Sequence, residues 1–238
     1  MILSAYDLGY QELNRQIRTL DEDIVIEKCF GERFIGSGAR NKTITINGTP
    51  GNALGAYMDG ATVIVNGNAQ DAVGDTMNDG KIIINGDGGD ALGYAMRGGK
   101  IFVRGSTGYR TGIHMKEYQD KRPVIVVGKS AGSFLGEYLA GGLIIVLGLG
   151  EDNILDGSFI GTGMHGGEIY LRTKEPPRNL PKQVSLSLAT QEDIAKIADI
   201  ISEYARDFDL DLNEILSETF YKLTPNAKNP YKQLYTEN

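Results

Sequence analysis

Hydrophobic residues and glycines recur along this chain at a nearly constant spacing. The segment NGTPGNALGAYMDGATVIVNG, residues 47–67, is followed by two closely similar segments, residues 66–86 and 85–105. A glycine inside each segment returns every 19 residues, at Gly55, Gly74 and Gly93. Such a short period excludes a repeat of helix pairs, and the Leu/Asn signature of leucine-rich repeats is missing.

Seven copies of the pattern follow one another. Their first glycines are Gly36, Gly55, Gly74, Gly93, Gly112, Gly136 and Gly161. Three residues later each copy has an apolar residue, in order Ala39, Met58, Met77, Met96, Met115, Leu139 and Met164. A β-branched segment follows, from TITING in the first copy to EIYLRT in the last. The last two intervals are 24 and 25 residues, and we place the extra residues in loops outside the repeated core.

Each copy contains a predicted strand and a second short apolar piece such as NALG or SFLG, separated by glycine turns. This arrangement is typical of a β-solenoid, in which successive turns of the chain stack in parallel. We therefore predict a mainly β fold of about seven coils with an α-helix at each end. Corner glycines are expected to adopt φ > 0, so Gly86→Val is predicted to cost several kcal/mol, including about 1–2 kcal/mol of backbone strain.

The period of two residues along a strand predicts which side chains point inward. Two inward rows are predicted: Ile44, Val63, Ile82, Ile101, Val124, Ile144 and Ile169, and Ile46, Val65, Ile84, Val103, Val126, Val146 and Leu171. The methionines are expected to fill the interior, because a flexible thioether packs well there. The positions between the two rows are predicted to form an outward apolar strip: Thr45, Ile64, Ile83, Phe102, Ile125, Ile145 and Tyr170. Such a strip is expected to be covered by the protein's own helices or by a partner.

The flanking segments are predicted to be helical. Residues 4–20 place Leu13 and Ile17 on one face, and a longer amphipathic pattern follows a capping box formed by Thr190 and Asp193. The segment DLNEILSETFYKL continues the apolar spacing, and the tail from residue 225 is expected to be an extended docking segment. The resulting division is 1–23, an N-terminal helical segment; 24–173, the repeats; 174–189, a proline-rich linker; and 190–238, a C-terminal helical segment and tail.

The composition of the chain argues against several classes of partner, cofactor and cellular location. The net charge of −7 argues against nucleic acid or an anionic membrane as the main partner. Cys29 is the single cysteine, which excludes an internal disulfide framework, and with only His114 and His165 beside it a zinc site is not expected. No apolar run approaches the ~20 residues of a membrane span, and no secretion signal is recognised at the start. We expect a cytoplasmic protein.

Motifs that suggest chemistry have structural explanations. GTGMHG, residues 161–166, matches a dinucleotide fingerprint, but a strand is expected to follow it where the fingerprint needs a helix. The aspartates of the turns lack the calcium-binding repeat, and Asn47, Asn66 and Asn85 are expected to form a ladder of side-chain hydrogen bonds. A cluster in the fifth copy could form an acid–base site on the outer face of a β-helix enzyme: Arg110, His114, Lys116, Glu117, Asp120 and Arg122. The alternative is a charged loop.

The phrase G-x-x-Met-x-x-G-x-Ile-x-Val-x-G, with GKSAGSFLGEYLAGGLIIVLG at 128–148 and GTGMHGGEIYLR at 161–172, resembles the C-terminal GxGxG-repeat domain of glutamate synthase large chains. The resemblance covers roughly residues 24–173. It implies a right-handed parallel β-helix, here a single-stranded β-solenoid, without catalytic, cofactor-binding or metal-binding residues. It also implies protein partners, a glutaminase-like and an FMN-synthase-like chain, which would carry FMN and an iron–sulfur cluster. The chain begins Met1-Ile2 and lacks a glutaminase cysteine, a three-cysteine motif and an FMN barrel, so it resembles a stand-alone form of that one domain.

Three hypotheses therefore remain open from the sequence. The first is a scaffold subunit of a glutamate-synthase-like amidotransferase–oxidoreductase complex, without activity of its own. The second is a scaffold in a formyl-group-processing complex, because the repeat is also similar to the glycine-repeat subunits of formylmethanofuran dehydrogenase and of formyltransferase/hydrolase complexes. The third is an independent β-helix enzyme that acts on carbohydrate. A homo-oligomer is compatible with each of them.

Overall fold

A computed structural model shows how the repeats are arranged, and it describes residues 1–226. Most of the tail predicted to dock, from residue 227 onward, lies outside the described residues. The elements in chain order are β1 (Ile2–Ser4), α1 (Ala5–Thr19), β2 (Ile24–Phe30), β3 (Thr43–Thr49), β4 (Asp59–Asn66), β5 (Asp79–Ile84), β6 (Lys100–Val103), β7 (Val124–Val127), β8 (Ala131–Gly132), β9 (Ala140–Val146), β10 (Leu155–Asp156), β11 (Gly166–Arg172), β12 (Val184–Leu188), α2 (Gln191–Phe208), α3 (Leu212–Leu216) and β13 (Phe220–Pro225).

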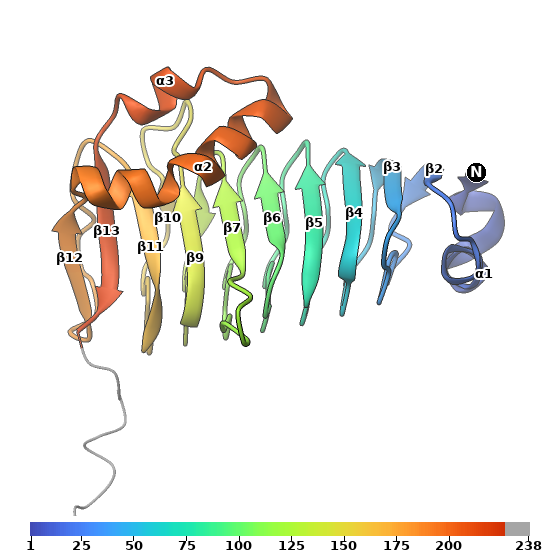
Figure 1. Cartoon of the computed structure of the whole chain (residues 1–238), viewed down its shortest axis with the longest axis horizontal. Helices are drawn as coiled ribbons and strands as arrows, with labels where there is room; N and C mark the ends of the chain where they lie inside the picture. The colour runs from blue at the N-terminus through green and yellow to red at the C-terminus, as the bar shows by residue number, and fades with distance from the viewer. Residues whose placement is uncertain (227–238) are drawn as a thin grey trace, which may run out of the picture.

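One mixed sheet of 11 strands dominates the molecule (Figure 1). Its order is β1-β2-β3-β4-β5-β6-β7-β9-β11-β13-β12. Neighbouring strands from β1 to β11 are parallel, whereas β13 runs antiparallel to both β11 and β12. The short strands β8 and β10 pair separately in a parallel two-stranded sheet.

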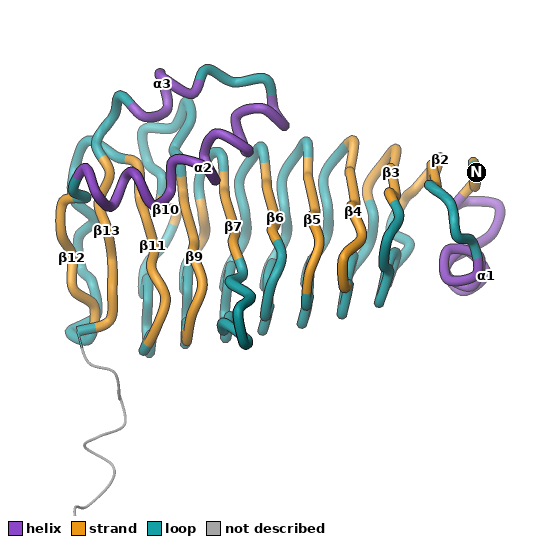
Figure 2. Tube along the Cα trace, viewed as in Figure 1, coloured by secondary structure: helices purple, strands orange, loops and turns teal. Residues whose placement is uncertain are grey.

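The prediction of a right-handed β-helix of about seven coils is wrong. All of the described strands except β8 and β10 lie in one open sheet, which two antiparallel strands, β12 and β13, extend at its C-terminal edge. The segments that return the chain from one strand to the next are mostly turns (Figure 2). Backbone geometry explains this difference, because Ala53 and Tyr57 have φ angles of 63° and 57°, which are incompatible with a strand. The apolar piece NALG contributes a buried Leu54 to a turn instead of a second strand.

The return segments are nevertheless regular. Each one hydrogen bonds to the equivalent segment of the previous copy, as where the Gly55 N–H donates to the Ile35 carbonyl at 2.8 Å and the Gly74 N–H to the Leu54 carbonyl at 2.8 Å. Between the sheet and these segments lies the larger hydrophobic core. The methionines from Met58 to Met164 at the repeat position are fully buried in it, which confirms the packing role predicted for them.

The predicted faces of the fifth repeat strand are reversed. In β7, Ile125 pairs with Ile101 and joins the inner core, whereas Val126 pairs with Phe102 and faces outward. A shift of one residue exchanges the two faces of a strand. The sequence PVIVVG is apolar at every strand position, so its pattern holds no information about the register.

The outward apolar strip is covered by the protein's own helix α2 over much of its length. Phe102 and Tyr170 are fully buried in a second core with α2 residues. The ring of Phe102 meets that of Tyr204 edge-on at 5.5 Å between centroids, and the Tyr204 hydroxyl donates to the Val103 carbonyl at 3.0 Å. The capping box of Thr190 and Asp193 at the start of α2 is confirmed.

The other helical predictions are met in part. Helix α1 buries Leu13 and Ile17 as predicted, whereas α3 ends at Leu216 and Phe220 begins strand β13. Within residues 1–226, none of the helices combines the length and the apolar character that a membrane crossing requires.

Gly86 is required for a different reason from the one predicted. Its φ angle lies outside the left-handed region, so the expected backbone strain is absent. A Cβ at this position would instead lie 2.1 Å from Asn68 Oδ1 and 2.8 Å from the Gly67 carbonyl oxygen. A side chain at Gly86 would therefore separate two neighbouring repeats.

An ion-pair cluster attaches α2 to the sheet and predicts a dependence on pH. Glu203 accepts from Lys81 at 2.7 Å and also pairs with Lys100, while Asp207 pairs with Lys81. Burial raises the pKa of Glu203, but the hydrogen bonds from Lys100 and Lys81 outweigh it, so the pKa falls below its ordinary 4.5. A carboxylate with a lowered folded-state pKa stabilises the fold above its unfolded-state pKa and loses this contribution as the pH falls.

We expect Glu203→Gln to reduce the free energy of unfolding near neutral pH by about 1 kcal/mol, as is usual for partly exposed ion pairs. The difference from the wild type should shrink as the pH falls below the ordinary pKa of the carboxyl, because the wild-type carboxylate then becomes protonated. Urea denaturation of both proteins across this acid range measures the effect. A difference that stays constant with pH would show that the charge of Glu203 is not the cause.

Candidate functional site

Left-handed residues recur at two positions of each return segment and direct side chains outward. The residue two places before the repeat glycine has a φ of 61° at Arg110, 64° at Phe134 and 67° at Phe159. The residue two places after it has a φ of 56° at His114 and 52° at Tyr138. Since a left-handed residue other than glycine costs about 1–2 kcal/mol, the surrounding hydrogen bonds must hold these positions.

Those hydrogen bonds place equivalent side chains of successive repeats beside each other. The Arg110 N–H donates to the Ser133 carbonyl and the Phe134 N–H to the Ser158 carbonyl, each at 2.9 Å. The rings of Phe134 and Phe159 consequently stack at 5.0 Å between centroids with an interplanar angle of 14°. At each of the two left-handed positions, the side chains of successive repeats therefore lie next to one another and form a row along the molecule.

The second row forms a similar stack. His114 and Tyr138 lie parallel, with ring centroids 5.0 Å apart. Tyr94, which precedes the equivalent residue Ala95 of the fourth copy, meets His114 edge-on at 5.9 Å. We refer to Tyr94, His114, Phe134, Tyr138 and Phe159 together as the aromatic face. Tyr94 and Phe159 are exposed by 40% and 56%, so this face is open to solvent.

A charged pair lies within the aromatic face. The guanidinium of Arg110 lies 4.8 Å from the centre of the Phe134 ring, and its Nε donates to Glu137 Oε2 at 3.1 Å. The Glu137 side chain is mostly buried, whereas that of Arg110 is half exposed. The arrangement presents a cation and several π-faces together, as in many surfaces that bind other molecules.

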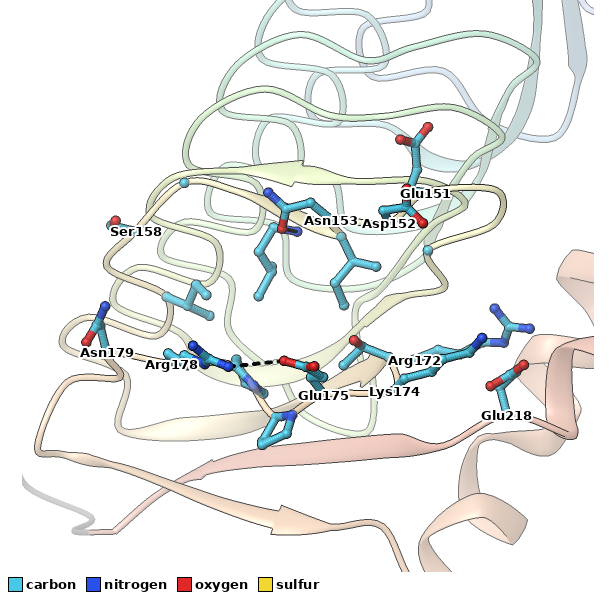
Figure 3. Close-up of a pocket in the computed structure, with 18 of the residues that line it drawn as sticks. Glu151, Asp152, Asn153, Ser158, Arg172, Lys174, Glu175, Arg178, Asn179 and Glu218 are labelled. Atoms are coloured by element: carbon cyan, nitrogen blue, oxygen red, sulfur yellow. Dashed lines mark hydrogen bonds and ion pairs between the residues drawn. The ribbon is translucent and has the colours of Figure 1, made fainter.

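A pocket adjoins the aromatic face at Phe159. Its volume is about 810 Å³, and it lies between the segment 148–160 and the segment 172–179, with Glu218 at one side (Figure 3). Charged side chains of both signs line it, namely Glu151, Asp152, Arg172, Lys174, Glu175, Arg178 and Glu218.

Most of the charged side chains that line the pocket form ion pairs or hydrogen bonds to backbone carbonyl oxygens. Arg178 pairs with Glu175 at 3.2 Å, and Lys129 outside the pocket pairs with Glu151 at 3.5 Å. Arg172 donates to the carbonyl oxygens of Ile215 and Leu147 at 2.9 and 3.1 Å, so it braces α3 against the sheet. Among the side chains that the structure describes here, no lining hydroxyl is hydrogen-bonded to a base.

The structure disperses the charged cluster predicted in the fifth repeat. Arg110 and His114 belong to the aromatic face. Arg122 and Glu117 of the cluster pair with each other at 3.3 Å, and Arg122 also pairs with Glu168, outside the cluster, at 2.7 Å. Lys116 and Asp120 are exposed. The cluster therefore does not converge on one catalytic position. The aligned repeats show the recurrence of aromatic residues at these two positions, but not the left-handed conformation that turns them outward.

The remaining motifs serve the turns. GTGMHG leads directly into strand β11, so the helix that a dinucleotide fingerprint requires is absent at this place. Asp71 and Asp90 accept hydrogen bonds from the backbone N–H groups of Asp90 and Tyr109 in the next repeats. The asparagine ladder is confirmed, with Asn66 donating to Asn47 at 2.7 Å and Asn85 to Asn66 at 3.2 Å. Among residues 1–226, no group of three or more acidic, histidine or cysteine side chains is arranged to hold a metal ion.

Comparison with known proteins places these features in context. The crystal structure of the formyltransferase/hydrolase complex FhcABCD from Methylorubrum extorquens, with methylofuran, contains a chain of similar fold. The TM-score is 0.64 at 22% identity, over 86% of this chain and 73% of that one. The protein MJ1350 of Methanocaldococcus jannaschii, whose function is uncharacterised, is 43% identical over 251 residues, which cover 99% of this chain and 96% of that protein.

The family model described as GXGXG motif matches residues 11–228. This match extends well beyond the repeats recognised in the sequence, because it includes most of α1 and all of the segment from β12 to β13. Together with the repeat glycines and the parallel strands between them, it shows that this chain belongs to the GXGXG motif family.

Proposed function

We propose that this chain is a scaffold subunit of a multi-protein complex, without catalysis of its own, and that the aromatic face binds another subunit. The observation that carries the proposal is the stacking of rings held by strained backbone positions, with His114 and Phe159 exposed and Phe134 and Tyr138 half-buried. Exposed aromatic side chains beside an arginine are typical of the residues that dominate the binding energy of protein interfaces. The dispersed charges of the fifth repeat support a binding role over a catalytic one.

The complex we favour is a glutamate-synthase-like amidotransferase–oxidoreductase. Its partners are a glutaminase-like chain and an FMN-synthase-like chain, which carry the FMN and the iron–sulfur cluster, while this chain sets their relative position. Support comes from the repeat phrase that the chain shares with glutamate synthase large chains and from its membership of the GXGXG motif family.

A formyl-group-processing complex is the second candidate. One specific observation favours it, since the solved structure of similar fold is part of a formyltransferase/hydrolase complex. At 22% identity that likeness supports the fold and leaves the partner open. In this case the same aromatic face would bind a protein of the formyl-transferring machinery.

Reconstitution distinguishes the candidates. The full chain is mixed with the glutaminase-like and FMN-synthase-like proteins of the same organism, and separately with formyltransferase/hydrolase subunits, and complex formation is followed by size-exclusion chromatography. We expect a stable complex with the first set and an increase in its glutamate synthase activity. Binding to the second set alone would favour the second candidate, and binding to neither would contradict the scaffold function.

The aromatic face is tested with Phe134→Ala and Tyr138→Ala. Alanine already occupies these repeat positions in the fourth copy, at Ala91 and Ala95, so both variants should fold. We expect the affinity for the partner to fall by about tenfold or more for each variant. Tyr6→Ala is the control, because Tyr6 is 78% exposed but lies on α1. Unchanged affinity in both test variants would place the interface elsewhere.

A further inference from the structure

Strand β12 ends the large sheet and leaves one backbone edge without a partner strand among the described residues. The Ala189 N–H donates to the Phe220 carbonyl, and the Asn226 N–H to the Gln183 carbonyl, each at 2.9 Å. Residues of an antiparallel strand alternate in the side to which their backbone groups point. Odd-numbered residues of β12 therefore bond to β13, and the N–H and C=O groups of Leu186 and Leu188 point to the free edge.

This edge lacks the usual protection against pairing with another chain. Natural edge strands carry lysines, prolines or bulges that prevent such pairing. Residues 183–189, QVSLSLA, contain neither a charged residue nor a proline. The Leu188 side chain is 60% exposed, and the opposite edge strand, β1, has only 3 residues.

We propose that the free edge of β12 pairs with the same strand of a second copy of this chain, in an antiparallel dimer with two-fold symmetry. Centred on Leu186, the two strands would exchange the backbone hydrogen bonds of Leu186. The Leu188 N–H would donate to the Val184 carbonyl of the second copy. The Val184 N–H would take no part in this pairing, because it already donates to the Pro181 carbonyl of its own chain.

Side-chain positions match this pairing on both faces of the strand. Val184 and Leu186 point toward the inner core, so the exposed Leu188 would lie across from Val184 of the second copy. Ser185 and Ser187, exposed on the opposite face, would meet across the two-fold axis without any like charges. Lys182 precedes the strand and Glu192 follows it, so antiparallel pairing brings ends of opposite charge together.

Two charge variants test the geometry of this dimer. Ser185→Glu with Ser187→Glu places like charges opposite each other across the axis, whereas Ser185→Lys with Ser187→Glu places opposite charges there. Both variants share Glu at position 187, next to Lys222 on β13, so they differ only at position 185. Sedimentation equilibrium of the full chain measures the dissociation constant, and melting temperatures report on folding.

We expect a wild-type dimer, at least about tenfold weaker dimerisation of the like-charge variant, and a retained dimer in the opposite-charge variant. Equal dimerisation of the two variants, or a monomeric wild type at all concentrations, would overturn the proposal. A further variant that ends at Asn226 is expected to dimerise as the full chain does. If only that shortened chain dimerised, the residues after 226 would cover the edge, and the proposal would also be wrong. The outcome is independent of the reconstitution with other subunits.

Discussion

Replacing Gly80 with alanine is expected to lower the free energy of unfolding by about 2–5 kcal/mol. Gly80 has a φ of +105°, and a Cβ there would lie 2.3 Å from the Ala61 carbonyl oxygen and 3.0 Å from the Ala61 nitrogen. The first contribution is backbone strain of about 1–2 kcal/mol. The second, about 1–3 kcal/mol, arises because both obstructing atoms belong to the backbone of a paired strand and cannot move independently.

Gly38→Ala is the matched control for this prediction. Gly38 also has a left-handed φ, +68°, but a Cβ there would meet nothing within 4 Å. Only the strain should remain, at about 1 kcal/mol. Urea denaturation of the two variants separates the contributions. Equal losses in both would show that the contact between neighbouring strands does not determine the need for glycine.

Phe102→Ala is expected to reduce the free energy of unfolding by about 3–5 kcal/mol. The ring is fully buried between the sheet and α2, where it contacts Tyr204 and lies beneath the Lys81 ammonium at 4.9 Å. The substitution leaves a cavity in the interface that attaches the helix to the sheet. Chemical denaturation measures the loss.

Tyr204→Phe provides the comparison on the helix side of this interface. It removes only the hydroxyl that donates to the Val103 carbonyl, so the expected cost is about 1–2 kcal/mol. If Phe102→Ala cost no more than Tyr204→Phe, helix α2 would not be packed on the sheet as described.

The aromatic face was only partly predictable from the sequence. The sequence places Arg110 and His114 in a charged cluster, yet the structure joins them to Phe134, Tyr138 and Phe159 from later repeats. A linear sequence shows which residues occupy equivalent positions. It does not show that these positions are left-handed, and only that conformation turns the side chains outward into a common stack.

The free edge of β12 was not predicted from the sequence. The segment 174–189 was predicted to be a proline-rich linker because of its prolines, although VSLSL within it alternates apolar and polar residues as a strand does. Strand β12 forms because β13 returns beside β11 and offers it a partner, and these contacts connect residues far apart in the chain.

The sequence by itself determined the repeat, the strands that follow each glycine, the burial of the methionines and the capping box of α2. These features depend on short-range spacing, which a local pattern records completely. The tertiary structure alone decided that the strands form an open mixed sheet, that β7 turns Ile125 inward, and that α2 covers the strip containing Phe102. The physical reason is that strand register and sheet closure depend on hydrogen bonds between distant segments, and an entirely apolar strand such as VIVV fits either register equally well.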